Sequence, residues 1–242
     1  RTGPPNAVKN WALCSPRTQG KDQPARIIFE LNATRQAIEP RHTMAHVGNL
    51  NYATGLARDT IRVDTVEHLL AAFMSLGVDN AIVELNSPEV PIMDGSAAPF
   101  IYLIQEAGVR QLPTPRRYLK VLRPISMSRG DKRIAVYPSD HFKVTYSIAF
   151  DHPMLLHQSR TIRLTEESFV EEIAPARTFG FLKEVEIMRQ HGLALGGSLE
   201  NAVVIGDTGV LNNALRFDDE FVRHKILDLI GDMALVGHPL IG

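Results

Sequence analysis

An amphipathic segment near the end of the chain constrains the fold more than any other feature. Residues 218–236 carry apolar side chains at the spacing of a helix that buries one face. These apolar side chains are Val222, Ile226, Leu229, Ile230 and Met233. Beside them, His224, Asp228 and Asp232 follow one another at four-residue intervals, which places them on one stripe of the helix. The segment therefore predicts a helix that packs against a core and presents an imidazole and two carboxylates along one line.

The other predicted elements indicate an α+β protein. One helix is expected to end at Gly77 and to begin after Asp64, which can cap it with Glu67 three residues later. Further helices are expected at residues 100–106, 166–173 and 183–191. Strands are expected at residues 26–31, 78–85, 118–122, 133–137, 142–150, 177–181 and 201–205.

The best candidate for a domain boundary is the proline-containing, basic stretch at residues 110–133. Strands and helices recur in a similar order on both sides of it, which indicates two α+β units of related design. We therefore expect a first domain at residues 1–112 and a second at residues 113–242.

Composition excludes several classes of protein. The 26 basic and 27 acidic residues give a net charge of -1, which argues against a nucleic-acid-binding protein. The single cysteine, Cys14, fits a reducing compartment and excludes a cysteine-rich zinc site, so a metal ion would need histidine and carboxylate ligands. The longest apolar run, residues 69–74, is too short to span a bilayer, so stable membrane insertion is not expected.

The stripe at His224 and Asp228 can bind a metal ion. An imidazole and a carboxylate one helical turn apart reach one ion from the same side, and zinc accepts this ligand set. The alternative is a solvated helix face with a hydrogen-bonded histidine. Lys225, next to His224, can hold an anionic group or a developing oxyanion, and Asp232 can orient a ligand or a catalytic histidine.

A second piece of the same chemistry lies at Glu67 and His68. Adjacent helical residues point about 100° apart and can flank one pocket. His68 would complete a three-ligand site with His224 and Asp228, and Glu67 would take a proton from the reacting water. The alternatives are a capping role for Glu67 and an interface role for His68.

Five runs of residues resemble a known family, the UDP-3-O-acyl-N-acetylglucosamine deacetylases, which are zinc enzymes of lipid A biosynthesis. The runs are residues 65–69 (TVEHL), 91–100 (PIMDGSAAPF), 176–181 (ARTFGF), 196–198 (GGS) and 217–232 (FDDEFVRHKILDLIGD). Their order and spacing also fit, and the resemblance covers roughly residues 40–242.

The resemblance implies a fold of two similar α+β domains, each a β-sheet with two helices, with the helices sandwiched between the sheets. It implies that zinc (Zn2+) is bound by His68, His224 and Asp228, with Glu67 as general base. It further implies roles for Thr178 at the oxyanion, Lys225 at the substrate diphosphate and Asp232 in orienting a catalytic histidine. Residues expected to line the substrate site are Phe179, Gly197 and Phe150.

The implied reaction removes acetate from the 2-acetamido group of a UDP-linked, 3-O-acylated glucosamine. We expect a cytoplasmic monomer whose partner is this small molecule. The family's general-acid histidine lies downstream of Gly242, and nothing in residues 1–25 matches the family's Gly-rich turn, so we expect intact metal ligation with impaired turnover.

Three rival interpretations stay open. The first is a zinc amidohydrolase that acts on another acylated amino sugar. The second is a zinc-binding relic with a structural or regulatory role. The third is a small α+β binding module without a metal, which would require His68 and His224 to lie far apart.

Overall fold

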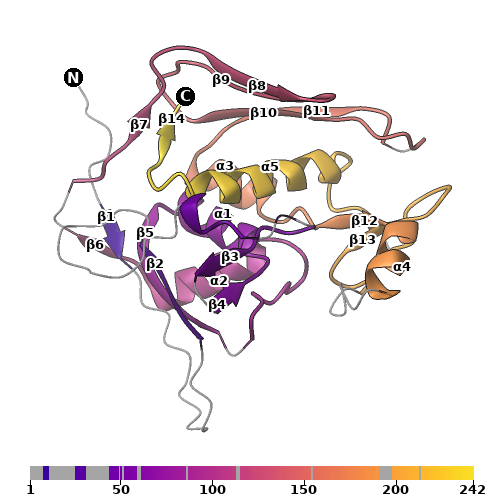
Figure 1. The fold of residues 1–242 in the computed structure, drawn as a ribbon, viewed down its shortest axis with the longest axis horizontal. Helices are drawn as coiled ribbons and strands as arrows, with labels where there is room; N and C mark the ends of the chain where they lie inside the picture. The colour runs from indigo at the N-terminus through magenta and orange to yellow at the C-terminus, as the bar shows by residue number, and fades with distance from the viewer. Residues whose placement is uncertain are drawn as a thin grey trace, which may run out of the picture.

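The computed structural model describes residues 8–10, 25–30, 44–48, 50, 52–58, 61–85, 87–112, 115–153, 155–190, 198–212 and 214–242. Within these residues the protein is a mixed α+β structure with helices α1–α5 and several small sheets (Figure 1). The coarse part of the predicted fold class is therefore confirmed.

The first half of the chain forms a four-stranded sheet in the order β2-β5-β1-β6. Its strands are β1 (Val8–Asn10), β2 (Ala25–Glu30), β5 (Val78–Leu85) and β6 (Arg110–Leu112). β5 pairs in parallel with β1 and antiparallel with β2. Helix α1 (Glu67–Ser75) packs against β5 and against α2 (Ala98–Ala107), while β3 (Leu56–Arg58) and β4 (Ile61–Val63) form a small hairpin that precedes α1.

The second half is built from short strand pairs. Antiparallel hairpins join β8 (Ile125–Arg129) to β9 (Lys132–Val136) and β10 (Lys143–Ile148) to β11 (Gln158–Arg163). Parallel pairs join β12 (Phe179–Phe181) to β13 (Val203–Ile205) and β7 (Leu119–Lys120) to β14 (Leu240–Ile241). The helices are α3 (Glu166–Ser168) with a π-helical turn at Phe169–Ile173, α4 (Leu182–Gln190) and α5 (Glu220–Ala234).

Helix α5 is the element that joins the two halves. It packs against α1 on one side and against β10 and β11 on the other, so the order of layers is β5, α1, α5 and then the β10–β11 hairpin (Figure 1). The apolar side chains at the centre of this stack are fully buried, among them Leu70 and Phe73 of α1 and Ile226, Leu227 and Ile230 of α5. The amphipathic pattern of residues 218–236 therefore predicted correctly both a helix and its burial.

A glycine of α5 lets the two helices meet at the N-terminal end of α1. A Cβ atom at Gly231 would lie 2.0 Å from the backbone oxygen of Glu67 and 2.7 Å from its carbonyl carbon. Real Cβ atoms do not approach a backbone so closely, so any larger residue at this position would push α5 away from α1.

Several element predictions need correction. Asp64 does not cap α1: the N-cap is Val66, no side chain caps the helix, and the Asp64 carboxylate instead accepts a hydrogen bond from Arg62. Strands β8 and β11 were not predicted from the sequence. Within the described residues, none of the helices combines the length and the apolar character that crossing a membrane needs.

Candidate metal centre and active site

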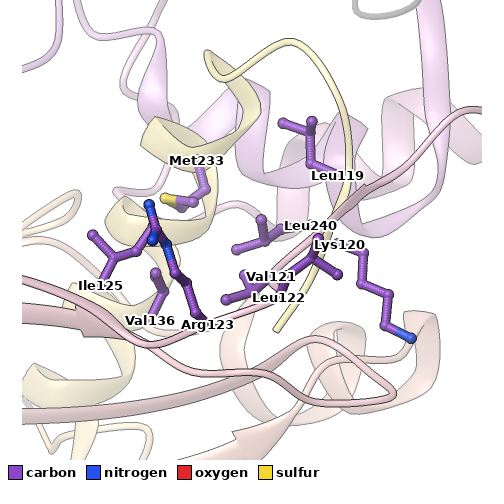
Figure 2. A pocket seen from close by; sticks show the side chains of 9 residues that line it. All are labelled: Leu119, Lys120, Val121, Leu122, Arg123, Ile125, Val136, Met233 and Leu240. Atoms are coloured by element: carbon purple, nitrogen blue, oxygen red, sulfur yellow. The ribbon is translucent and has the colours of Figure 1, made fainter.

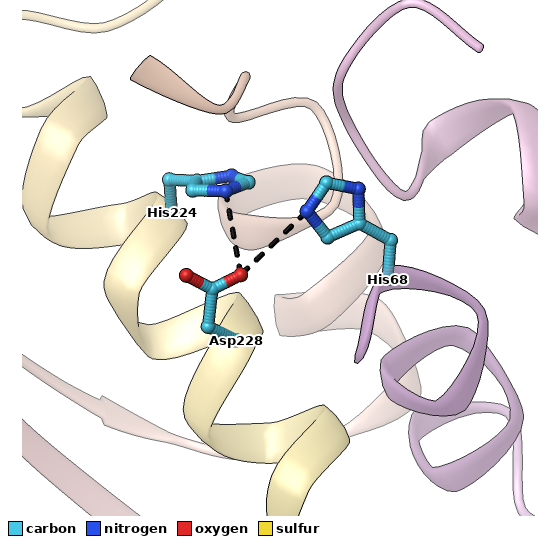
Figure 3. Close-up of side chains that lie close together, drawn as sticks. All are labelled: His68, His224 and Asp228. Carbon is cyan, nitrogen blue, oxygen red and sulfur yellow. Dashed lines mark ion pairs between the residues drawn. The ribbon is translucent and has the colours of Figure 1, made fainter. Parts of the chain in front are cut away.

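Three predicted metal ligands from the two halves of the chain converge at the contact of α1 and α5 (Figure 3). Asp228 Oδ1 lies 3.3 Å from His224 Nε2 and 3.6 Å from His68 Nε2. The two imidazole rings stand almost perpendicular, with centroids 4.9 Å apart. One ligand atom from each of the three residues lies within 4.8 Å of the other two. The sequence placed His224 and Asp228 on one stripe, and the helix contact adds His68.

The hydrogen bonds of His224 suit a metal ligand. Its Nδ1 lies 3.0 Å from the carbonyl oxygen of Ala176, and because a carbonyl only accepts, Nδ1 carries the proton. The Nε2 lone pair therefore faces Asp228. Burial lowers the pKa of His224 to about 4, more than Asp228 raises it, so the ring is neutral near pH 7. A neutral imidazole with its second nitrogen held by a carbonyl is the usual form of a histidine ligand.

The spacing and the unpaired atoms fit a divalent cation. Two ligand atoms about 2.1 Å from a tetrahedral ion lie about 3.4 Å apart, close to the separations of Asp228 Oδ1 from the two histidines. Within the part of the chain that the structure describes, Asp228 Oδ1 and His68 Nδ1 are buried without a hydrogen-bond partner. A buried carboxylate oxygen that accepts no hydrogen bond is costly, and a cation beside it would remove that cost. The group can therefore bind a metal ion.

Lys225 lies at the edge of this group. Its Nζ donates a hydrogen bond of 2.6 Å to Asp228 Oδ2, the oxygen that does not face the histidines. Burial acts to raise the pKa of Asp228, but His224 and Lys225 outweigh it and hold this pKa well below its usual range. The carboxylate is thus charged, as a metal ligand must be.

Glu67, the predicted base, is the first residue of α1 and is buried. Burial raises its pKa to about 7, and the negative charge of Asp228 adds to this effect while His68 opposes it. The backbone N–H of Thr54 donates a 3.0 Å hydrogen bond to Glu67 Oε2. A carboxyl group that titrates near neutral pH and is held in one orientation is suited to take up and release a proton.

Asp232 lies one turn beyond Asp228 and meets Thr54 as well. The Thr54 hydroxyl donates a 2.7 Å hydrogen bond to Asp232 Oδ1. Burial raises the pKa of Asp232, and the hydrogen bond from Thr54 opposes that rise. That Asp232 orients a catalytic histidine stays a prediction.

Two residues of this region were missed from the sequence. Thr54 lies in a stretch where no element was predicted, and a single sequence carries no signal for its contacts. Tyr146 lies on β10 between Val144 and Ile148, which both point inward; burial raises its pKa, and the charges of Lys225, Asp228 and Asp232 also act on it. The alternation of the predicted strand at residues 142–150 would have placed Tyr146 on the inward face.

The predicted substrate-site residues form an aromatic wall beside the metal group. The Phe179 ring centroid lies 6.4 Å from that of His224 and 6.1 Å from that of Phe150. Lys225 Nζ lies 5.5 Å from the centre of the Phe179 ring, within the range of a cation–π contact. Gly197 lies outside the described residues.

Thr178 joins the wall to the loop at residues 91–100. Its backbone N–H donates a 2.7 Å hydrogen bond to the carbonyl of Gly95, and its carbonyl accepts one from Val203. Gly95 has a φ of +83°, and a Cβ atom there would lie 1.9 Å from the backbone oxygen of Asn201. This crossing of three segments needs a glycine for both reasons.

Two ion pairs fix the same segments to the start of α5. Arg177 donates to both carboxylate oxygens of Glu220, at 2.9 Å and 3.1 Å, and Glu220 is completely buried. Arg216 pairs with Asp94 at 2.9 Å. The runs at residues 91–100, 176–181 and 217–232, far apart in sequence, therefore lie together around one site.

An apolar hollow of about 390 Å³ shares no residue with this site (Figure 2). It lies where β7, β8, β9 and β14 meet the end of α5. Its lining residues are Leu119, Lys120, Val121, Leu122, Arg123, Ile125, Val136, Met233 and Leu240. Its lining holds no carboxylate or imidazole, whereas the α1–α5 contact holds both.

Comparison with known proteins agrees with this site. Residues 17–242 match the family model described as "LpxC: UDP-3-O-acyl N-acetylglycosamine deacetylase". A UDP-3-O-acyl-N-acetylglucosamine deacetylase of Geobacter sp. (strain M21) is 50% identical over 217 residues, which are 89% of this chain and 71% of the relative. The deacetylase of Pseudomonas entomophila (strain L48) is 49% identical over 219 residues, with 89% and 72% covered. That of Methylococcus capsulatus is 52% identical over 200 residues, with 81% and 66% covered. The metal group, the neighbouring carboxyl and these matches agree, and the chain belongs to the UDP-3-O-acyl-N-acetylglucosamine deacetylase family.

Proposed function

We propose that this chain is a zinc-dependent amide hydrolase that removes the 2-acetyl group from UDP-3-O-acyl-N-acetylglucosamine and releases acetate in lipid A biosynthesis. The observation that carries the proposal is the convergence of His68, His224 and Asp228 beside the buried carboxyl of Glu67. Membership of the deacetylase family supports the substrate.

His68, His224 and Asp228 would hold the zinc ion through two imidazole nitrogens and one carboxylate oxygen. When bound, zinc supplies a Lewis acid that polarises the amide carbonyl and lowers the pKa of water. The neutral state of His224 and the charged state of Asp228 are the protonation states that such ligation needs.

Side chains of this protein carry out the proton transfers of the proposed reaction. Glu67 takes a proton from the attacking water, and the Thr54 N–H keeps its Oε2 in place during that transfer. Thr178 stabilises the charge that develops on the amide oxygen. Asp232 orients the group that returns a proton to the leaving amine.

Binding of the sugar nucleotide uses the wall beside the metal group. Phe179, Phe150 and Gly197 line the substrate site, and the aromatic pair offers an apolar surface to the acylated sugar. Lys225, already within 5.5 Å of the Phe179 ring centre, supplies a positive charge for the diphosphate.

The larger arrangement follows the same proposal. Residues 1–112 and 113–242 form two similar domains, each a sheet with two helices, and the helices are sandwiched between the sheets. The packing of α1 on β5 and of α5 on β10 and β11 supports this arrangement. We further propose a cytoplasmic monomer that acts on a small molecule and binds no nucleic acid.

The test combines metal analysis with an assay. Purified wild type should contain one zinc ion per chain and release acetate from the UDP-linked substrate. His68→Ala and His224→Ala should both lose the metal, because each removes one of three ligands. Absence of stoichiometric zinc in wild type, or zinc retained by both variants, would overturn the site. Zinc without any acetate release would favour the zinc-binding relic, and release only from another acylated amino sugar would favour the first rival.

A further inference from the structure

Thr54 holds both carboxylates that flank the metal ligands. Its backbone N–H donates to Glu67 Oε2 at 3.0 Å, and its hydroxyl donates to Asp232 Oδ1 at 2.7 Å. Its carbonyl accepts a 3.1 Å hydrogen bond from the N–H of Val66, the N-cap of α1. Every polar group of Thr54 is therefore bonded to the start of α1 or to α5, and the residue is only 7% exposed.

The two bonded carboxylates come from different helices. Glu67 opens α1 and Asp232 lies in the last turns of α5, next to Gly231, whose Cα faces the backbone of Glu67. Thr54 thus lies at the junction where Gly231 of α5 closely approaches Glu67 of α1. Glu67 is buried, so few other donors reach its carboxylate, and the low polarity of its surroundings strengthens the bond from Thr54. Asp232 is exposed as a residue, and the Thr54 hydroxyl holds its Oδ1 at 2.7 Å.

We infer that Thr54 is a positioning residue for deacetylation: it holds the base Glu67 through its backbone and Asp232 through its hydroxyl in one geometry relative to the metal ligands. The inference rests on the proposed function. Thr54 itself touches neither the metal ligands nor the reacting atoms. Its contribution is to keep two proton-handling groups on two helices aligned during turnover.

The hydroxyl can be removed without disturbing the backbone. Thr54→Val is isosteric and retains both main-chain hydrogen bonds, but it leaves Asp232 Oδ1 without its donor. Thr54→Ser retains the hydroxyl and loses only a methyl group. A positioning role predicts that kcat of the zinc-loaded Thr54→Val protein falls about tenfold to a hundredfold with little change in KM, and that Thr54→Ser restores most of it.

Thr65→Val is the matched control. Thr65 is also 7% exposed, and its hydroxyl also donates to a carboxylate, Glu89 Oε1 at 2.8 Å, but that carboxylate is outside the proposed site. This control should lower stability as Thr54→Val does while kcat stays near the wild-type value. Zinc content is measured for every variant and should stay at one ion per chain.

The outcomes separate this inference from the proposed function. If wild type turns over and Thr54→Val keeps its kcat, or if Thr65→Val loses as much, the inference is wrong while the function stands. If wild type releases no acetate, the function fails, and the crystal structure of Thr54→Val then decides. An Asp232 carboxylate that rotates away from its wild-type position, and returns in Thr54→Ser, supports the inference; an unmoved one overturns it.

Discussion

At the scale of single residues, burial gives the carboxyl of Glu67 its chemistry. An ordinary glutamate is ionised and solvated at neutral pH, whereas burial raises the pKa of Glu67 to about 7. Asp228, only a few ångströms from two imidazoles, is shifted the opposite way because His224 and Lys225 outweigh its burial. These opposite shifts suit the two carboxyls to the different tasks proposed for them, proton transfer and metal ligation.

Glu67→Gln tests this division of tasks. The amide keeps the size and the contact with Thr54 but cannot take a proton, so acetate release should fall about a hundredfold to ten-thousandfold. The zinc content should stay at the wild-type level, because Glu67 is not one of the three ligands. Parallel metal analysis and steady-state kinetics check both statements, and a variant with normal kcat would remove Glu67 from the mechanism.

The sequence pointed to the proposed metal ligands and the proposed base, but it carried no signal for Thr54. His224 and Asp228 followed from helical spacing, and His68 and Glu67 from an adjacent pair that the family motif supports. Thr54 makes its contacts through a backbone N–H and one hydroxyl across the fold, and neither leaves a periodic pattern. Contacts of this kind depend on how helices cross, which propensity and spacing do not encode.

At the scale of elements, the crossing of α1 and α5 depends on Gly231. Helix propensity alone predicts that Gly231→Ala stabilises α5 by about 1 kcal/mol. The added Cβ atom would lie 2.0 Å from the backbone oxygen of Glu67, however, so the helices must separate beside the proposed metal site. We expect a net loss of about 1–3 kcal/mol in the free energy of unfolding and weaker zinc binding.

The control for Gly231→Ala is Gly206→Ala. The side-chain atom nearest to a Cβ at Gly206 would be the end of the flexible Leu211 side chain, at 3.1 Å. That variant should keep its zinc affinity. Chelator competition measures the affinity, and thermal unfolding measures the stability. A Gly231→Ala protein that is more stable than wild type and binds zinc equally well would show that the helices can part without consequence.

The ion pair between Arg177 and Glu220 makes the stability of the α5 start depend on pH. Burial favours the neutral form of Glu220, but hydrogen bonds from Arg177 and Arg216 outweigh it, so the pKa of Glu220 falls below its ordinary value of 4.5. The Glu220 carboxylate therefore binds a proton less readily in the folded state than in the unfolded state. The stabilising contribution of the ion pair is complete above pH 4.5 and is lost as the pH falls through the folded-state pKa of Glu220.

Glu220→Gln should therefore be less stable than wild type at pH 7, by about 1–3 kcal/mol, and the difference should shrink toward about pH 3. Melting temperatures of both proteins, measured between pH 3 and pH 7, give this difference in stability. The exposed Glu171→Gln serves as control and should follow the wild-type curve. A constant difference between Glu220→Gln and wild type across the range would show that the carboxylate charge is not what Arg177 stabilises.

Helices and strands were predicted correctly where burial leaves a clear pattern in the sequence, and were missed where it does not. The long helix was predicted at residues 218–236 and is α5, Glu220–Ala234, because burial of a whole face leaves a strong pattern. The expected cap at Asp64 was wrong because its carboxylate pairs with Arg62 two residues earlier. Strand β8 was missed because all five of its residues are exposed, and β11 because only Ile162 is buried, so neither shows a buried alternation.

At the scale of the whole molecule, the proposed metal site connects the two halves of the chain. His68 comes from α1 and His224 and Asp228 from α5, and these helices pack against the layers on either side. Zinc that binds only the folded state adds RT ln(1 + [Zn]/Kd) to the free energy of unfolding, about 4 kcal/mol at a free zinc concentration a thousand times Kd. Removal of zinc should therefore lower the melting temperature of both halves together.

Chelation followed by calorimetry measures this effect. The wild-type transition should move down by several degrees on addition of a chelator and return on addition of zinc. The His68→Ala protein should have the same melting temperature with chelator and with zinc, because it lacks the proposed ligand that the first half supplies. If the chelator splits the wild-type transition into two, zinc is what couples the halves; if it shifts a single transition, the buried α1–α5 contact alone keeps them cooperative. The large shared core of Leu70, Phe73, Ile226 and Ile230 favours the single transition.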